Sequence, residues 1–377
     1  MIPSTEQEMI RNAARDFTAK EISPRAMDWD KTCTVPVKVL TDLGKLGMMG
    51  MCVPPEWGGS GTDFVSYILA TEEIAAGDCG VCNMMNVHNS PVCVVLRDYG
   101  TDEQKQRMLR PLARGELFGA FLLTEPHAGS DAGALRTTAV RLGDKYILNG
   151  TKQFITGGST AHIAMIIAVT DPSLGRKGMT CFMTRTDNPG YKVARVEHKL
   201  GHRSNDTCQI VFDDMEVPAE DVVGNIGDGY KIALANLEGG RIHVGAQAVG
   251  VARAALEAAV KYANERETFG KTIIQHQAIA FKLADMGTQV AAARQLVLHA
   301  AQVKDTGANA LKEASMAKLF ASEMAERVCS DAIQIHGGYG YLTDFPVEKY
   351  YRDARILQIY EGSSEVQKLL ISRGNFL

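Results

Sequence analysis

The stretch KYILNGTKQFITGGSTAHIAMIIAV, residues 145–169, decides the fold class of this chain. Its short runs of β-branched and aromatic residues, interrupted by glycines, predict strands rather than helices. The runs VRL, MTCFMTR, KVARV and CQIVF continue the pattern on both sides, and Gly143-Asp144 and Asn149-Gly150 have the composition of tight turns. We therefore expect a small β barrel or sandwich in the middle of the chain.

The segments that flank these strands have the apolar spacing of helices. Met9, Ala13 and Phe17 recur at the helical period, and Leu, Ala, Lys and Glu dominate residues 230–335. The glycine- and proline-rich VPPEWGGSG at 53–61 predicts a loop between the first helices.

The order helices, strands, helices predicts an α+β fold that is mainly α. A chain of 377 residues exceeds the roughly 250 to 300 at which one hydrophobic core stops growing, so several domains are expected. We expect an N-terminal helical domain at 1–118, a middle β domain at 119–225 and a C-terminal helical bundle at 226–377. Segregated elements exclude a doubly wound βαβ fold, in which strands and helices alternate.

Composition limits the partners. With 40 basic and 44 acidic residues, the net charge of -4 gives no basic surplus for nucleic acid. The N-terminus lacks a signal sequence, and the longest apolar runs are too short to span a bilayer. Eight scattered cysteines indicate reduced thiols, and the single Cys79-x-x-Cys82 pair lacks the further ligands of a metal site. We expect a soluble cytoplasmic protein without a bound metal.

Two apparent nucleotide motifs fail on inspection. The GKT at 270–272 resembles the end of a phosphate loop, but Glu265 occupies the position of the required glycine. The GNIGDG at 224–229 has the dinucleotide spacing in reverse and lacks a surrounding βαβ unit, so it is interpreted as a loop that joins domains.

The C-terminal stretch IYEGSSEVQ, residues 359–367, is more informative. Ser364 and Gln367 have the spacing of a capping box, so a helix is predicted to begin there, with Glu361 on the turn before it. A carboxylate on such a turn can enter a cavity, although most glutamates of this kind are solvated or interact with the helix dipole.

Five segments together resemble the acyl-CoA dehydrogenase family, nearest its short-chain and branched-chain members. They occur in the order and spacing of that family and extend over most of the chain. They are FLLTEPHAGSD (121–131), NGTKQFITGG (149–158), RETFGK (266–271), QIHGGYGY (334–341) and YRDARILQIYEGSSEVQ (351–367).

The resemblance implies a flavoenzyme that binds FAD and oxidises an acyl-CoA thioester to the trans-2-enoyl-CoA. Glu361 is then the base that removes the α proton, while the β hydride passes to N5 of the flavin. The carbonyl is polarised by the backbone N–H of the glutamate and a ribityl hydroxyl. Electrons then pass to an electron-transfer flavoprotein, and a short or branched acyl chain is favoured.

Site residues follow from the resemblance position by position. Seven residues of the middle domain are expected at the flavin: Phe121, Leu123, Thr124, Ser130, Phe154, Ile155 and Thr156. A second set is expected to hold the FAD of a neighbouring subunit, which implies a homotetramer built as a dimer of dimers: Arg266, Phe269, Gln277, Gln334, Ile335, His336, Gly337 and Gly338. Ser363 and Glu365 are also expected at FAD, and the substrate is expected at Ser130, Glu238, Gly239, Gly240, Arg241, Tyr360 and Gly362.

Some positions depart from the family pattern or allow two interpretations. His127 stands where a small residue is usual, and Phe154 stands where many members have tryptophan. Some members carry the base at the position of Gly240, and glycine there favours Glu361 in this chain. Met84 and His88 fall near the expected acyl pocket, and core packing and a structural role are the favoured interpretations.

Two competing functions remain open. Oxidases, desulfinases and nitroalkane-oxidising enzymes share the scaffold, so fold alone does not fix the reaction. A non-catalytic helical interaction protein is the other alternative, and it would bind no flavin.

Overall fold

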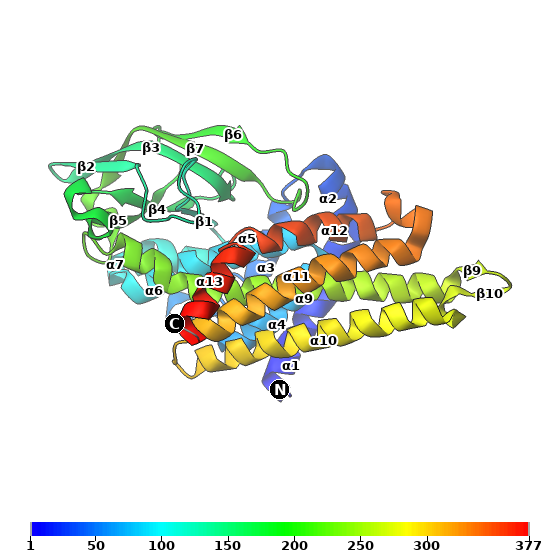
Figure 1. Ribbon diagram of the computed structural model, residues 1–377. Coiled ribbons are helices and arrows are strands. Elements are labelled where there is room, and N and C mark those ends of the chain that lie inside the picture. The colour runs from blue at the N-terminus through cyan, green and yellow to red at the C-terminus, as the bar shows by residue number, and fades with distance from the viewer. Residues whose placement is uncertain (1, 376–377) are drawn as a thin grey trace.

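The computed structural model describes residues 2–375 and begins with a group of helices (Figure 1). Local capping sets their starts: Ser4 and Gln7 form a capping box at the first helix, and the side chains of Asp63 and Asp78 cap the fourth and fifth. The helices are α1 (Thr5–Phe17), α2 (Ala26–Thr32), α3 (Val37–Lys45), α4 (Phe64–Gly77), α5 (Cys79–Val87), α6 (Val94–Tyr99), α7 (Asp102–Gln104) and α8 (Arg110–Ala113), with a π-helical segment, η4 (His88–Cys93), after α5.

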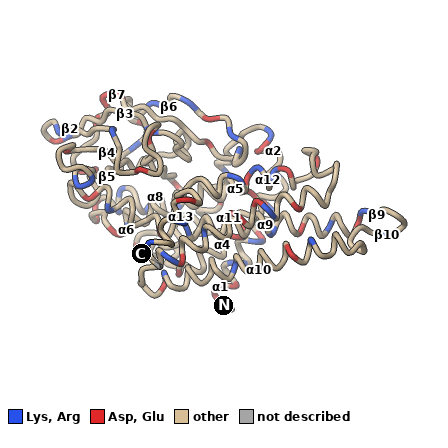
Figure 2. The backbone as a smooth tube through the Cα atoms, in the orientation of Figure 1, with Lys and Arg blue, Asp and Glu red and all other residues tan. Residues whose placement is uncertain are grey.

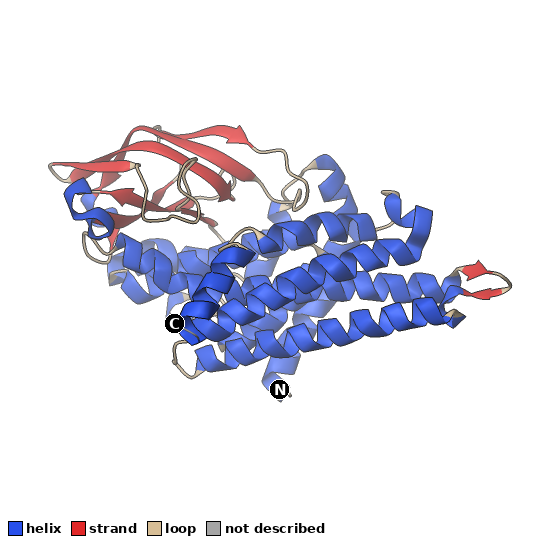
Figure 3. Ribbon diagram, viewed as in Figure 1, coloured by secondary structure: helices blue, strands red, loops and turns tan. Residues whose placement is uncertain are grey.

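A mixed sheet of eight strands follows, in the order β6-β7-β3-β2-β4-β5-β8, with β1 parallel to β4. The strands gather at one end of the molecule and the helices fill the rest, which confirms the expected mainly helical α+β fold (Figure 3). The strands are β1 (Gly119–Leu122), β2 (Thr138–Leu142), β3 (Lys145–Thr156), β4 (Ile163–Val169), β5 (Met179–Arg185), β6 (Tyr191–Val196), β7 (Thr207–Pro218) and β8 (Val222–Val223).

Strand β4 contains the continuous apolar run for which a strand was predicted. Ile163, Met165 and Ile167 face a core shared with the N-terminal helices, whereas Ala164 and Ile166 face the core inside the β domain. A strand covered on both faces has no need of polar alternation. The strand therefore attaches the β domain to the helices through a common core.

The predicted turn at Asn149-Gly150 is wrong. These residues lie inside β3, where the register against β7 shifts between Leu148 and Gly150. Gly150 has a φ of 151°, and a Cβ there would lie 2.5 Å from Oγ1 of Thr137. The glycine therefore serves a bulge and a close approach, because the long pairing with β7 outweighs the local turn preference.

The C-terminal part is a helical bundle. Helix α9 contributes a continuous buried face rich in alanine and glycine, which lets α11 and α4 pack closely against it. A short hairpin separates two of the long helices expected over 230–335. The elements are α9 (Gly229–Glu265), β9 (Glu267–Thr268), β10 (Lys271–Thr272), α10 (Gln277–Asp305), α11 (Leu311–His336), η9 (Gly337–Tyr341), α12 (Val347–Arg355), η10 (Ile356–Gln358) and α13 (Ser364–Asn375).

The capping box predicted from Ser364 and Gln367 is also wrong in detail. Helix α13 begins at Ser364, so Ser363 precedes it, and the Val366 N–H donates to Oγ of Ser363 at 3.5 Å. The Gln367 side chain instead donates to the carbonyls of Glu361 and Gly362. Tertiary position, rather than the local motif, therefore sets the role of Gln367.

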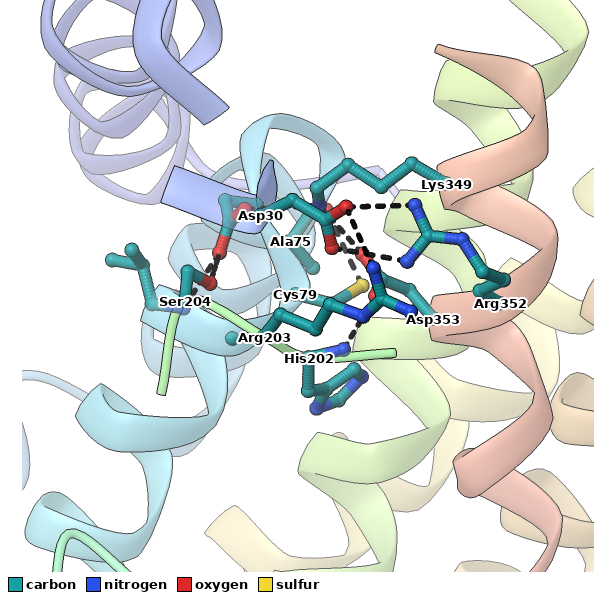
Figure 4. Close-up of polar contacts among 12 residues, drawn as sticks. Asp30, Ala75, Cys79, His202, Arg203, Ser204, Lys349, Arg352 and Asp353 are labelled. Carbon is teal, nitrogen blue, oxygen red and sulfur yellow. Dashed lines mark hydrogen bonds and ion pairs between the residues drawn. The ribbon is translucent and has the colours of Figure 1, made fainter. Parts of the chain in front are cut away.

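A buried ionic network joins the three parts of the molecule (Figure 4). Lys349 of α12 contacts Oδ2 of Asp78 at 2.9 Å and Oδ2 of Asp353 at 2.6 Å. Oδ1 of Asp353 accepts the backbone N–H of His202 at 2.6 Å, and Asp78 also accepts the hydroxyl of Ser204. The network therefore fixes a loop of the middle domain against α12 and the start of α5.

Elsewhere charges of both signs are interspersed over the molecule (Figure 2). Within residues 2–375, no helix combines the length and the apolar character needed to cross a membrane. In the same residues, no group of three or more His, Cys, Asp or Glu side chains is arranged to hold a metal ion.

Candidate active site

Glu361 lies on the tight turn between η10 and α13, with its backbone in the left-handed region at a φ of 53°. Its carboxylate lies against Gly240 of α9, where an added Cβ would be only 2.6 Å from Glu361 Oε2. That oxygen is buried and has no hydrogen-bond partner among the described residues. An unpaired buried carboxylate oxygen is costly and is typical of a functional group that awaits a ligand.

Burial raises the pKa of Glu361, and the cations of Arg241 and Lys318 oppose the shift without cancelling it. Nε of Arg241 also lacks a hydrogen-bond partner among the described residues. A carboxylate whose pKa lies nearer to neutrality is a stronger base, as general base catalysis requires.

The turn that carries Glu361 is fixed by polar contacts. Nζ of Lys318 donates to the Gly362 carbonyl at 2.7 Å, and Gln367 Nε2 donates to the same carbonyl at 2.8 Å. Before the turn, the Tyr360 hydroxyl donates to Gln247 Oε1 at 2.7 Å. The base is therefore held by α11, α13 and α9 together.

The expected flavin residues of the middle domain come from two segments that meet. The Gln153 N–H donates to the Thr124 carbonyl at 2.8 Å, which joins the end of β1 to the end of β3. Thr156 accepts a hydrogen bond from Asn83 of α5 at 3.2 Å. The segment from Phe121 through Leu123 to Thr124 thus lies beside Phe154, Ile155 and Thr156, at the junction of the β domain and α5.

Phe154 fits the role of an aromatic wall. Its φ of 60° lies in the left-handed region beside a register shift of β3, and its side chain is 65% exposed. Strained backbone that presents a large apolar side chain to the outside is often a functional feature. Ser130 and His127 lie on the exposed loop after β1, and the His127 ring lies 3.1 Å from the Ala134 carbonyl.

The second expected cofactor set lies at the other end of the bundle (Figure 1). Phe269 is at the tip of the β9-β10 hairpin and is 97% exposed. The guanidinium of Arg266 lies over the ring of Tyr339 in η9, and Tyr262 stacks on His336 at a centroid distance of 4.3 Å. The hairpin is thereby brought together with the end of α11 and η9. Gln334, Ile335, Gly337 and Gly338 belong to this cluster, and Gln277 begins α10 next to the hairpin.

Within one chain, these two sets do not form a single site. The first set comes from β1, β3 and the loop after β1 in the β domain, whereas the β9-β10 hairpin projects from the opposite end of the long helices (Figure 3). Ser363 and Glu365 lie with Glu361, at the start of α13.

The expected substrate stretch on α9 borders a cavity of about 330 Å³ that Phe64, Ser90, Gly239 and Lys304 help to line. The Glu238 carboxylate is already paired, because it contacts Nζ of Lys304 and accepts the Ala310 N–H, each at 3.1 Å. The two glycines between Glu238 and Arg241 face different groups: Gly239 faces residues that line the cavity, and Gly240 faces Glu361.

The favoured interpretations near the acyl pocket agree with the structure. Met84 and Met85 are buried in the core. His88 is a structural residue, since its Nε2 lies 3.0 Å from the Leu112 carbonyl and its Nδ1 accepts the Gly119 N–H. Burial lowers the pKa of His88 to about 4, so its ring is neutral.

Sequence reasoning missed Lys318 and assigned Gln367 to a helix cap, whereas both side chains contact the turn of the base. A signal was present for Lys318, because it interrupts the run of small and apolar residues in SMAKLFA at 315–321. A lysine on the buried face of a helix is rare unless it is paired.

Several observations fit a large planar cofactor such as FAD. Phe154 and Phe269 offer exposed aromatic faces, and buried polar atoms of Glu361 and Arg241 lack partners among the described residues. The backbone of Gly337, at a φ of 60°, and of Gly338 has no atom within 4 Å of an added Cβ, so a bulky group can approach it closely.

Comparison with known protein families covers nearly the whole chain. The acyl-CoA dehydrogenase N-terminal domain matches residues 4–116, the middle domain matches 120–215, and the C-terminal domain matches 227–376.

Individual relatives are similar over their full length. An acyl-CoA dehydrogenase of Bacillus subtilis is 49% identical, over 98% of this chain and 97% of the relative. A short-chain specific acyl-CoA dehydrogenase of Clostridium acetobutylicum is 44% identical, over 97% of each chain. An acryloyl-CoA reductase (NADH) of Anaerotignum propionicum is 43% identical, over 98% of this chain and 94% of the relative.

Solved structures agree with these relatives. The butyryl-CoA dehydrogenase of Megasphaera elsdenii superposes with a TM-score of 0.97 at 42% identity over 99% of both chains. A chain from a structure described as the electron transferring flavoprotein of Acidaminococcus fermentans gives a TM-score of 0.98 at 45% identity, over 100% of this chain and 99% of that one. This protein therefore belongs to the acyl-CoA dehydrogenase family of FAD-dependent oxidoreductases.

Proposed function

We propose that the protein oxidises a short or branched acyl-CoA to the trans-2-enoyl-CoA, with Glu361 as the base. The observation that carries the proposal is the buried, unpaired Oε2 of Glu361 against Gly240, in surroundings that raise the pKa of the carboxyl group. A base of this kind is required because the α proton of a thioester is only weakly acidic.

Different residues of this chain have different roles in the proposed reaction. Glu361 takes the α proton, and the electron pair of that C–H bond forms the new double bond as the β hydride leaves. FAD, when bound, supplies the acceptor for that hydride. The segments at 121–124 and 154–156, with Ser130, are proposed to hold the flavin, while Ser363 and Glu365 contact it beyond the base. The Glu361 N–H is proposed to help polarise the thioester carbonyl.

The remaining substrate contacts are assigned to α9 and to the turn of the base. Glu238, Gly239, Gly240 and Arg241 are proposed to line the path of the thioester, with Tyr360 and Gly362 on the other side. The cavity beside Gly239 supports this assignment.

A homotetramer built as a dimer of dimers is part of the proposal. The exposed Phe269 lies at the tip of the β9-β10 hairpin, which projects from the end of the long helices opposite the β domain. This position supports a role for Phe269, Arg266 and Gln277 at the FAD of a neighbouring subunit. An arginine suits this role because its fork matches phosphate oxygens. The domain limits 1–118, 119–225 and 226–377 are proposed with it.

An electron-transfer flavoprotein is the proposed electron acceptor. A structure described as such a flavoprotein contains a chain that has the same fold as this one and is 45% identical to it in sequence. An oxidase would instead pass electrons directly to oxygen and release peroxide. We also propose a cytoplasmic location, which cell fractionation would test.

The decisive experiment is an anaerobic visible spectrum of the purified protein, before and after adding acyl-CoAs of graded length and branching. We expect the flavin band to bleach with short or branched thioesters. Glu361→Gln should keep bound FAD, but its flavin band should bleach about a hundredfold or more slowly, because the base is removed. Glu103→Gln, at an exposed site remote from Glu361, is the control and should bleach as the wild type does.

Full bleaching of the Glu361→Gln variant would exclude Glu361 as the base. A colourless protein that takes up no FAD would favour the non-catalytic alternative. Rapid reoxidation by oxygen with peroxide release would favour an oxidase.

A further inference from the structure

The buried lysine at position 318 has no structural partner that accounts for its charge. Lys318 lies on α11 and is fully buried at 0% exposure. Its one hydrogen bond in the described residues is from Nζ to the Gly362 carbonyl, and no carboxylate there lies within 4.0 Å of Nζ. A buried ammonium group is costly unless it is paired, so its position calls for an explanation.

Its single contact is on the turn that carries the proposed base. Glu361 and Gly362 both have left-handed backbone, with φ values of 53° and 87°. For Glu361 this conformation is strained and persists only where surrounding contacts impose it. Lys318 and Gln367 supply those contacts, because both donate to the Gly362 carbonyl and Gln367 also donates to the Glu361 carbonyl at 3.1 Å.

The geometry leaves the carboxylate free. A salt bridge would occupy the oxygen that must take the proton, but neither Lys318 nor Arg241 forms one with Glu361, whose Oε2 has no partner in the described structure. Lys318 instead acts on the carboxylate through its charge, in surroundings where the effective dielectric constant is low. A cation placed in this way favours the ionised base without blocking it.

We propose that Lys318 is a positioning residue for Glu361: with Gln367 it holds the left-handed turn, and its charge favours the ionised carboxylate. The inference rests on the proposed role of Glu361 as the base. It assigns to α11 a part in catalysis that requires no contact between Lys318 and the substrate.

The charges around both groups agree with this role. Burial raises the pKa of Glu361, while Arg241 of α9 and Lys318 of α11 oppose the shift. Burial lowers the pKa of Lys318 to about 8, with Glu361 the largest opposing charge, Arg241 adding to the decrease, and Glu365 and Glu323 opposing it. Lys318 is thus mainly protonated at neutral pH.

The test is the pH dependence of anaerobic flavin reduction by a short acyl-CoA that reduces the wild type. Lys318→Met should keep FAD and slow reduction by about ten- to a hundredfold, because the turn is less well held. The acidic midpoint of its pH profile should move to higher pH, since a charge that stabilises the carboxylate is lost. Lys318→Arg should move the midpoint back toward the wild-type position.

Gln367→Leu is the matched control because it removes a neutral donor from the same carbonyl. It should slow reduction while leaving the midpoint in place. An unmoved midpoint in Lys318→Met would reduce Lys318 to a structural role, and a rate within twofold of the wild type would overturn the proposal. If Lys318→Met yields no flavoprotein, the pH dependence is measured on Lys318→Gln instead. An unchanged rate of flavin reduction in Gln367→Leu would contradict the proposal that Lys318 and Gln367 together hold the turn.

A second readout separates this inference from the proposed function. Infrared difference spectra of the wild type against Glu361→Gln follow the protonated carboxyl band of Glu361 without any substrate. In the Lys318→Met background this band should persist to higher pH. If no acyl-CoA reduces the wild type, the proposed function fails, whereas an unmoved infrared titration in Lys318→Met contradicts the role of Lys318 alone.

Discussion

At the scale of single residues, Gly240 leaves the space that the carboxylate of Glu361 occupies. The two residues are far apart in sequence, and an added Cβ at position 240 would lie 2.6 Å from Oε2 and 3.2 Å from Cδ of Glu361. Real Cβ atoms do not approach other atoms so closely, so the glutamate side chain must move if residue 240 is not glycine. The position of the Glu361 carboxylate therefore depends on the absence of a side chain at position 240.

We expect Gly240→Ala to slow flavin reduction by about tenfold to a hundredfold, because displacement of a base by about 1 Å has effects of this size. The variant should still bind FAD, since helix α9 gains rather than loses helical propensity. Stopped-flow reduction by a short acyl-CoA measures the effect.

The control for this substitution is Gly287→Ala on α10, where an added Cβ would meet only Leu256 at 3.9 Å. It should reduce at the wild-type rate. A Gly240→Ala variant that reacts as fast as this control would show that the carboxylate tolerates the methyl group.

At the scale of elements, α12 is attached to the rest of the molecule by charges rather than by apolar contacts alone. Burial by itself would lower the pKa of Lys349, but Asp353 and Asp78 outweigh it and raise the pKa well above the usual value. The ammonium group therefore stays charged between two buried carboxylates. A buried ion pair of this kind is costly to break because its partners are left uncompensated.

Lys349→Met should destabilise the protein by about 3–5 kcal/mol, since Asp78 and Asp353 would remain buried without a cation. Urea unfolding followed by far-UV circular dichroism measures the change. Lys38→Met removes an exposed partner of Asp42 on α3 and should change stability by less than about 1 kcal/mol. Equal unfolding midpoints for the two variants would contradict the structural role of the network.

At the scale of the whole molecule, the hairpin at 267–272 extends an exposed phenylalanine away from the body of the chain (Figure 1). Exposed large apolar side chains also occur along α10 and η9, at Phe281, Leu296 and Tyr341. Exposed apolar side chains of this kind are available for contact with another protein chain. It supports the proposed tetramer, in which the hairpin reaches the cofactor of another subunit.

We expect Phe269→Ala to weaken FAD retention and the tetramer together, because the side chain is 97% exposed in the isolated chain and contributes little to its fold. Sedimentation velocity gives the assembly, and the visible spectrum after gel filtration gives the FAD content. Leu174→Ala, at an exposed apolar residue of the middle domain, should alter neither. Loss of FAD from an intact tetramer would assign Phe269 to the cofactor alone.

The sequence by itself determined the order of helices and strands, the strand at 163–169 and the turn at Glu361, because these depend on hydrophobic periodicity and glycine placement over a few residues. Only the tertiary structure decided that Asn149-Gly150 is a bulge, that Gln367 holds the Glu361 turn, and that Lys318 donates to the Gly362 carbonyl of that turn. Each of these outcomes depends on contacts between residues distant in the chain. Such contacts can outweigh local preferences, because propensities differ by only about 1 kcal/mol per residue, whereas burial and pairing contribute several.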